Sequence, residues 1–146
     1  MKYFSRKIKT PDGVFDSKQE YETYLLLKQQ EKDGVITGLV RQKQFEIIPK
    51  LTKLVEVKLK TKTKFVERVE EQAAHYTPDF CYWKDGKYIL HEVKSKGSVL
   101  ARDYPLRRKL IKQIISQHNK VSNEEWEFVE TGITNKKTKT NRLIKK

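Results

Sequence analysis

The feature that most constrains the fold is the dipeptide Asp85-Gly86, which lies between two runs of β-forming residues, 79–83 and 88–94. Asp-Gly between such runs is a strong signal for a β-hairpin with a two-residue loop. The second run is strongly apolar, as is typical of a central strand that is buried on both faces. We therefore expect a sheet built around this hairpin.

The register of this hairpin brings three charged residues together. With residues 85 and 86 as the loop, paired positions sum to 171, so that Asp79 faces Glu92. Directly opposed residues have Cβ atoms about 4.5–5.5 Å apart on one face of the sheet. Lys94 falls on the same face, because it lies two residues beyond Glu92. A register shift of one residue would separate the two carboxylates.

Two opposed carboxylates repel each other, and a divalent cation would convert that repulsion into coordination. Mg²⁺ binds one or two carboxylates together with waters and phosphate oxygens. Lys94 could then stabilise charge that builds on a phosphate, which completes the groups needed for phosphodiester hydrolysis. The alternative is that Asp79, Glu92 and Lys94 form ordinary surface ion pairs. The apolar character of the strand favours the first interpretation, since charges at its buried end need a partner or a role.

Other local patterns predict the rest of a mixed α/β fold. We expect helices over residues 17–32 and from Pro105 onward, and strands over residues 40–49, 51–60, 65–69 and 126–129. The strands at 51–60 and 65–69 would form a Lys-rich hairpin. The residues expected to face the core are Tyr21, Tyr24, Leu25, Leu27, Phe45, Ile47, Ile48, Leu106, Leu110, Ile111, Ile114 and Ile115.

Glu20 has two competing interpretations. Ser17-x-x-Glu20 matches a capping box, in which Glu20 returns to the backbone N–H of Ser17. Glu20 also shares a helix face with Tyr24 and Leu27, which points it toward the body of the protein and allows a catalytic or metal-linked role. We expect the two roles to exclude each other. His91 and Cys81 are interpreted as packed residues.

Composition points to a polyanionic partner. The 146 residues carry 32 Lys and Arg against 19 acids, a formal net charge of +13, which favours nucleic acid. Cys81 is the only cysteine, and no segment has the length and hydropathy of a membrane span or signal peptide. These observations predict a cytoplasmic protein with no membrane association.

Five ordered segments resemble a known superfamily. Residues 76–80 (Tyr-Thr-Pro-Asp-Phe) and 91–94 (His-Glu-Val-Lys) look like the PD-(D/E)xK nuclease signature. Residues 13–20, 42–49 and 103–109 resemble segments of a small phage-encoded family assigned to it. The departure from the pattern is the Lys-rich stretch at about 50–72, which bears on the choice of substrate.

This resemblance implies a restriction-endonuclease-like core, a mixed sheet flanked by helices, that uses Mg²⁺ or Mn²⁺. It implies that Asp79 and Glu92 bind metal, that Lys94 is the catalytic lysine, that Glu20 is a further catalytic and metal-binding acid, and that Gln42 is a nearby polar contact. We expect one nuclease-like domain over residues 1–133, with the hairpin as an insertion, and a flexible basic tail over residues 134–146.

The expected function is that of a phage or prophage DNA endonuclease in a bacterial host, acting in recombination, replication or packaging. Branched DNA is a candidate substrate by analogy alone. A homodimer would supply two active sites. The residues expected to grip DNA phosphates are Lys58, Lys60, Lys62, Lys64, Arg107, Arg108 and Lys109. The alternatives are a DNA-binding protein with a silent nuclease fold and an RNA-directed protein.

Overall fold

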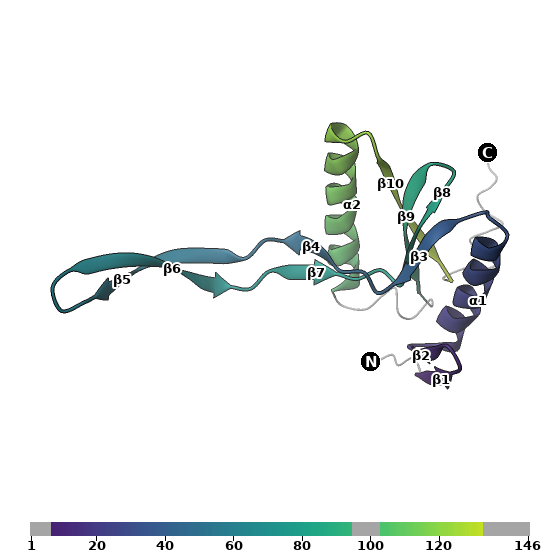
Figure 1. Ribbon diagram of the computed structural model, residues 1–146, viewed down its shortest axis with the longest axis horizontal. Coiled ribbons are helices and arrows are strands. Elements are labelled where there is room, and N and C mark those ends of the chain that lie inside the picture. The colour runs from purple at the N-terminus through teal and green to yellow at the C-terminus, as the bar shows by residue number, and fades with distance from the viewer. Residues whose placement is uncertain (1–6, 95–102, 133–146) are drawn as a thin grey trace. The chain divides into compact units, whose positions relative to one another are not determined.

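The computed structural model describes residues 7–94 and 103–132. The chain divides into two compact units, one of residues 1–43 and 77–146 and one of residues 44–76 (Figure 1). The expected tail at residues 134–146 lies outside the described residues. Helices and strands together form a mixed α/β protein, as the sequence predicts.

A four-stranded mixed sheet is the centre of the first unit. Its strands are ordered β10-β9-β8-β3. A separate two-stranded sheet, β1-β2, precedes the first helix, and in its turn Thr10 Oγ1 donates to the carbonyl of Gly13 at 2.7 Å. The bounds are β1 Ile8–Thr10, β2 Gly13–Phe15, β3 Thr37–Arg41, β8 Phe80–Lys84, β9 Lys87–Val93 and β10 Glu125–Thr131.

The hairpin of β8 and β9 has the predicted register. Trp83 pairs with Tyr88, and Phe80 pairs with His91. Asp85 and Gly86 form the loop with φ values of 52° and 80°, the left-handed backbone that a tight hairpin turn requires at both positions. The next pair beyond Phe80 and His91 is therefore Asp79 and Glu92.

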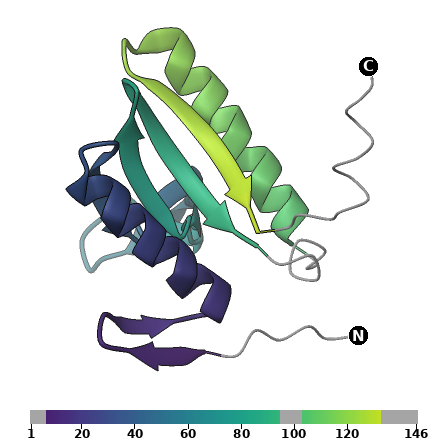
Figure 2. The same ribbon diagram turned by 90° about the vertical axis from the view of Figure 1, so that its right-hand side faces the viewer.

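Two helices cover opposite faces of this sheet (Figure 2). Helix α1, Lys18–Lys32, packs against the face that carries Phe80, Tyr82, Ile89 and Val93. Helix α2, Tyr104–Val121, connects β9 to β10, which lies parallel to β9. A helical crossover is the usual connection between parallel strands. Neither helix among the described residues has the length and apolarity needed to cross a bilayer.

The helix faces differ in part from those predicted. Leu27 is buried, but Leu25 is 46% exposed, so the buried side of α1 is narrower than expected. In α2 the buried residues are Tyr104, Ile111 and Ile115, while Leu110 and Ile114 are half-buried. Leu106 is 60% exposed, and its predicted core position is wrong. Tyr104 takes that place, because it lies seven residues before Ile111 and so on the same helix face.

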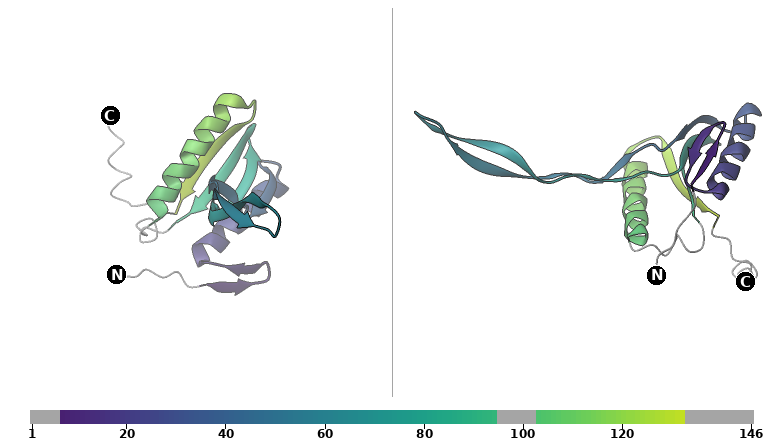
Figure 3. Two further views of the ribbon diagram at one scale, coloured as in Figure 1. Left: turned by 90° about the vertical axis from the view of Figure 1, so that its left-hand side faces the viewer. Right: turned by 90° about the horizontal axis from the view of Figure 1, so that it is seen from below.

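The second unit consists of paired strands. Strands β4, Phe45–Ile48, and β7, Ala74–Tyr76, pair with each other, and β5, Leu51–Lys58, pairs with β6, Thr63–Glu71 (Figure 3). The predicted hairpin is therefore confirmed. The predicted strand over residues 40–49 is divided between β3 and β4, and the core position of Ile48 is wrong, because its side chain is 43% exposed.

Candidate functional site

The hairpin positions the first two acids of the site at the end of the sheet. Asp79 directly precedes β8, and Glu92 lies in β9. The side chains are buried, with 8% of Asp79 and 5% of Glu92 exposed. Asp79 Oδ2 accepts a hydrogen bond of 2.8 Å from the backbone N–H of Val93, which fixes its carboxylate against the neighbouring strand.

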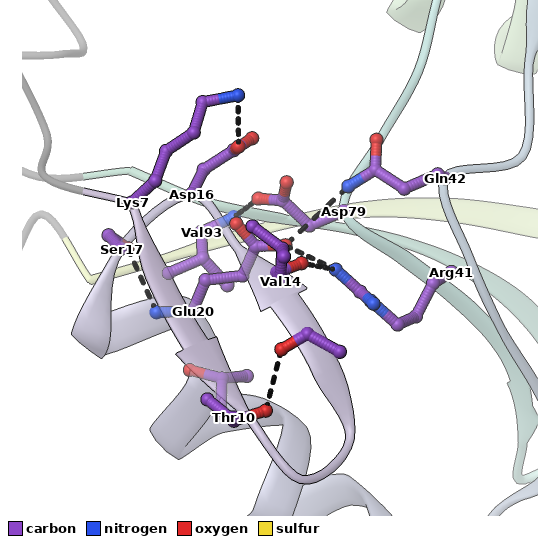
Figure 4. A network of polar contacts seen from close by, with 12 residues as sticks. Lys7, Thr10, Val14, Asp16, Ser17, Glu20, Arg41, Gln42, Asp79 and Val93 are labelled. Atoms are coloured by element: carbon purple, nitrogen blue, oxygen red, sulfur yellow. Dashed lines mark hydrogen bonds and ion pairs between the residues drawn. The ribbon is translucent and has the colours of Figure 1, made fainter.

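The start of α1 brings two more carboxylates to this end of the sheet. Oxygens of Asp16, Glu20 and Asp79 lie within 4.8 Å of one another, and Figure 4 shows these side chains turned toward each other. Glu20 is only 2% exposed, whereas Asp16 is exposed, and its carboxylate lies 3.5 Å from Lys7 Nζ. Burial of a carboxylate among other carboxylates is unfavourable unless a cation or proton is present.

Glu20 lies in the first turn of α1, where the sequence predicts either a helix cap or a place among the acids of the site. Ser17 is the N-cap of α1, and its Oγ accepts from the backbone N–H of Glu20 at 3.0 Å. The Glu20 carboxylate accepts a hydrogen bond from the backbone N–H of Asp16, one residue before the expected Ser17. The same carboxylate also faces Asp79. The bond from Glu20 to the backbone N–H of Ser17 that the capping box predicts is thus replaced by one to Asp16, and the carboxylate lies among the acids.

Burial and mutual repulsion make two of these carboxyls weak acids. Burial, reinforced by the charges of Asp79 and Asp16, raises the pKa of Glu20 to about 7. Burial, reinforced by Glu92, raises the pKa of Asp79 to about 7, although the Val93 N–H and Lys94 act in the opposite direction. Near neutral pH the site therefore holds an incompletely neutralised group of acids, and a divalent cation would be attracted to it.

Two residues at the end of β3 contact Glu20 (Figure 4). Arg41 Nη2 lies 3.6 Å from Glu20 Oε2 and donates to the carbonyl of Val14 at 3.1 Å, while its guanidinium lies 3.7 Å from the centre of the Phe15 ring. Gln42 Nε2 donates to Glu20 Oε2 at 3.5 Å. Gln42 also donates its backbone N–H to the carbonyl of Asp79 at 3.3 Å, from a left-handed conformation with φ of 58°. The predicted polar contact thus lies beside the acids.

Lys94 lies beside Glu92, as the strand period predicts. Its Nζ is 3.5 Å from Glu92 Oε2 and 4.7 Å from the centre of the Tyr104 ring at the start of α2. The hydroxyl of Tyr104 donates to Glu130, which also pairs with Arg108 at 3.2 Å. The lysine is therefore held between a carboxylate and an aromatic face, with its side chain 26% exposed.

The donor set fits a hard divalent cation. Carboxylate oxygens are the ligands that Mg²⁺ and Mn²⁺ prefer, and thiolate or imidazole groups are absent from the described cluster. The predicted metal ligands were Asp79, Glu92 and Glu20. The carboxylates within 4.8 Å of one another include Asp16 rather than Glu92. Glu92 lies outside this group, but its negative charge repels that of Asp79 and contributes to the raised pKa of Asp79.

The residues predicted to bind DNA fall into two sets, one in each unit. Lys58, Lys60, Lys62 and Lys64 are exposed around the turn between β5 and β6. The set on α2 differs in availability: Lys109 is exposed, whereas Arg107 pairs with Asp103 at 3.1 Å and Arg108 pairs with Glu130. The hairpin lysines are therefore the stronger candidates for phosphate contacts.

Sequence reasoning missed two residues of the site, Asp16 and Arg41. Asp16 is four residues before Glu20, a spacing that could have indicated a shared helix face, although it lies just before α1 begins. Arg41 carries no local signal, because its contact with Glu20 depends on how β3 packs against α1. Its Nε is buried and has no hydrogen-bond partner among the described residues.

Comparisons with known proteins give one match. A family model described as "Protein of unknown function (DUF1064)" matches residues 1–126, which include every residue of the site. No curated protein and no solved structure matches the chain.

Proposed function

Because the chain belongs to DUF1064, a family of unknown function, we propose from its own site that it is a metal-dependent DNA endonuclease. The observation that carries the proposal is the group formed by the buried carboxylates of Glu20 and Asp79 and the exposed carboxylate of Asp16, beside the Glu92–Lys94 pair. A purely structural site would gain more from apolar residues at these positions than from acids that repel one another.

The reaction is hydrolysis of a phosphodiester. The oxygen of water forms a bond to phosphorus, the bond to one ester oxygen breaks, and that oxygen leaves with a proton. Mg²⁺ or Mn²⁺ held by Asp79, Glu20 and Asp16, with Glu92 beside them, would supply Lewis-acid activation to this reaction. Removing the metal with EDTA should therefore stop cleavage.

Lys94 supplies the fixed positive charge of the site. Its Nζ lies 3.5 Å from Glu92 Oε2, beside the acids where a phosphate would bind. An ammonium held in place there stabilises the negative charge that grows on the phosphate oxygens, and it can hydrogen-bond the attacking water. The Tyr104 ring beneath it limits its motion, so little reorganisation is needed.

Charge supports DNA as the substrate. The chain carries a net charge of +13, and four exposed lysines gather around the β5–β6 turn with no acid between residues 58 and 64. Such contacts hold phosphates without reading sequence, and their strength falls steeply with salt. The role in phage recombination, replication or packaging and the preference for branched DNA remain parts of the same proposal that rest on resemblance and analogy.

The test is cleavage of a labelled four-way junction and a matched linear duplex by wild type, Lys94→Ala and the control Lys84→Ala, with Mg²⁺, Mn²⁺ or EDTA. Lys84 is exposed in the neighbouring strand, so its loss should leave cleavage close to that of wild type. We expect Lys94→Ala to lose about 10²–10³-fold in rate, as when one group that stabilises transition-state charge is removed, and to keep its affinity for DNA.

Three outcomes would contradict the proposal. Equal cleavage by wild type and Lys94→Ala would remove Lys94 from the mechanism. Tight DNA binding with no cleavage in Mg²⁺ or Mn²⁺ would favour the alternative, a DNA-binding protein with a silent nuclease fold. Stronger competition by single-stranded RNA than by branched DNA would instead indicate an RNA-directed protein.

A further inference from the structure

An aromatic row crosses three neighbouring strands of the sheet, at the end opposite the carboxylates. Trp126 of β10 is paired with Tyr88 of β9, and Tyr88 is paired with Trp83 of β8. The ring of Tyr88 lies 4.9 Å from that of Trp83 and 5.7 Å from that of Trp126, tilted by 52° and 54°. Tyr88 is buried, whereas the two tryptophans are only half-buried. The Tyr88 ring therefore lies deeper in the protein than the rings of the two tryptophans on either side of it.

This row lines a pocket of about 510 Å³. That volume lies within the range of about 300–1,000 Å³ found for small-molecule sites. Gly38 forms part of the wall, at a bulge in β3 where its φ is +67° and a Cβ would lie 3.5 Å from the Trp83 ring. Cross-strand aromatic pairs also stabilise a sheet, but that role does not need a pocket beside them.

The charged groups of the pocket favour a nucleotide base over a phosphate in its interior. Glu124 lines the pocket and accepts from Trp126 Nε1 at 3.3 Å. A carboxylate there repels phosphate but can accept from the amino group of a base. Lys43 is exposed at the pocket, with its Nζ 3.2 Å from the Tyr88 hydroxyl, where it can meet the phosphate of the same nucleotide.

The pocket and Glu92 lie toward opposite ends of β9 on one face of the sheet, with the buried Leu90 between them. Tyr88 and Glu92 lie four residues apart in β9, so their side chains point to the same side. At a rise of about 3.3 Å per residue, they are separated by about 13 Å along the strand.

From these observations, and resting on the proposed nuclease function, we propose that this pocket binds one unpaired base of the DNA substrate. The base stacks on Trp83 and on the face of Trp126 that is not covered by the His118 ring, which lies 3.8 Å from the Trp126 ring. Stacking on aromatic rings tolerates any base, because every base has a π face. The enzyme would thus select DNA by its structure, at a bulge, branch or single-stranded end, rather than by its sequence.

The test uses binding alone, in EDTA, so that it does not depend on cleavage. Trp83 and Trp126 are the two tryptophans of the chain, and therefore tryptophan fluorescence reports on this pocket alone. Wild type is titrated with an end-labelled duplex that contains one unpaired deoxyadenosine and with the fully paired duplex. We expect the first to quench the tryptophans and to bind about 5- to 150-fold more tightly, the gain from one stacked base.

Three variants give the matched comparison. Trp83→Ala should lose most of the preference, Trp83→Phe should keep much of it, and the control Lys84→Ala should bind both duplexes much as wild type does. Equal affinity of wild type for the two duplexes, or no quenching by the unpaired base, overturns the proposal even if Trp83→Ala does not fold. A preference without cleavage in Mg²⁺ would contradict only the nuclease function, and cleavage without a preference would contradict only the base pocket.

Discussion

Replacing Asp79 by Asn tests whether the buried acids of the site reduce the stability of the fold. The pKa of Asp79 is raised from 3.8 to about 7, by burial first and by Glu92 second. Between these two values the folded chain binds more protons at Asp79 than the unfolded chain does. Stability therefore falls as the pH rises from about 4 to about 7, and this loss is complete above the folded-state pKa.

The size of the effect follows from the shift. A difference of about three pH units corresponds to roughly 4 kcal/mol, at 1.36 kcal/mol per unit. Asn has nearly the same volume as Asp and keeps an oxygen to accept the 2.8 Å bond from the Val93 N–H. Asp79→Asn should thus match wild type near pH 4 and exceed its free energy of unfolding by up to roughly 4 kcal/mol above pH 7. Part of this gain comes from Glu20, whose pKa Asp79 also raises.

The assay is urea unfolding in EDTA across this pH range, for wild type, Asp79→Asn and the control Asp85→Asn. Burial lowers the pKa of His91 to about 4, which gives an opposite slope, but that slope is common to all three proteins and cancels in the difference. If the free energies of unfolding of wild type and Asp79→Asn changed in parallel with pH across this range, the reasoning would be refuted. In a second arm, Mg²⁺ at about 100 times its Kd should stabilise wild type by about 2.7 kcal/mol and Asp79→Asn by less.

Two further sets of variants test DNA binding and the stability of the fold separately. Replacing Lys58, Lys60, Lys62 and Lys64 together by Ala should weaken DNA binding and make the affinity less dependent on salt. The slope of log affinity against log salt concentration should fall by about 0.9 for each phosphate that the variant no longer neutralises. An unchanged slope would exclude the hairpin turn as the DNA-binding element. Gly132→Ala should destabilise the fold by more than about 2 kcal/mol, because a Cβ there would lie 2.7 Å from Gln19 Nε2 and 2.9 Å from the Lys94 carbonyl oxygen. The control Gly34→Ala has a similar positive φ and open space, so unfolding curves that shift equally for both would contradict the steric clash.

The parts of the site that the sequence predicted are those set by local geometry. Asp85-Gly86 fixes the loop, the loop fixes the register, and the register and strand period place Glu92 beside Lys94. A pattern of period two leaves few alternatives once the turn is known. The helix face indicated Glu20 and the resemblance added Gln42, and the fold brings both next to Asp79.

The parts that were missed depend on packing between distant segments. Asp16 joins the acids because α1 begins at the end of the sheet, and Arg41 reaches Glu20 only across the junction of β3 and α1. Leu106 has a helical spacing from Leu110 that predicts burial, yet the face of α2 that meets the sheet begins with Tyr104. Periodicity gives the existence of a buried face but fixes its orientation only when the opposing surface is known.

The way the second unit joins the chain has a consequence for how such proteins can diverge. Its first and last strands, β4 and β7, pair with each other, and Phe45 lies opposite Tyr76. The insertion therefore starts and ends at neighbouring points, and a change in its length adds little closure entropy. Variation in residues 50–72 can therefore change the surface of the hairpin without altering the spacing of the acids. Under the proposed function, substrate range and hydrolysis would be traits that can evolve separately.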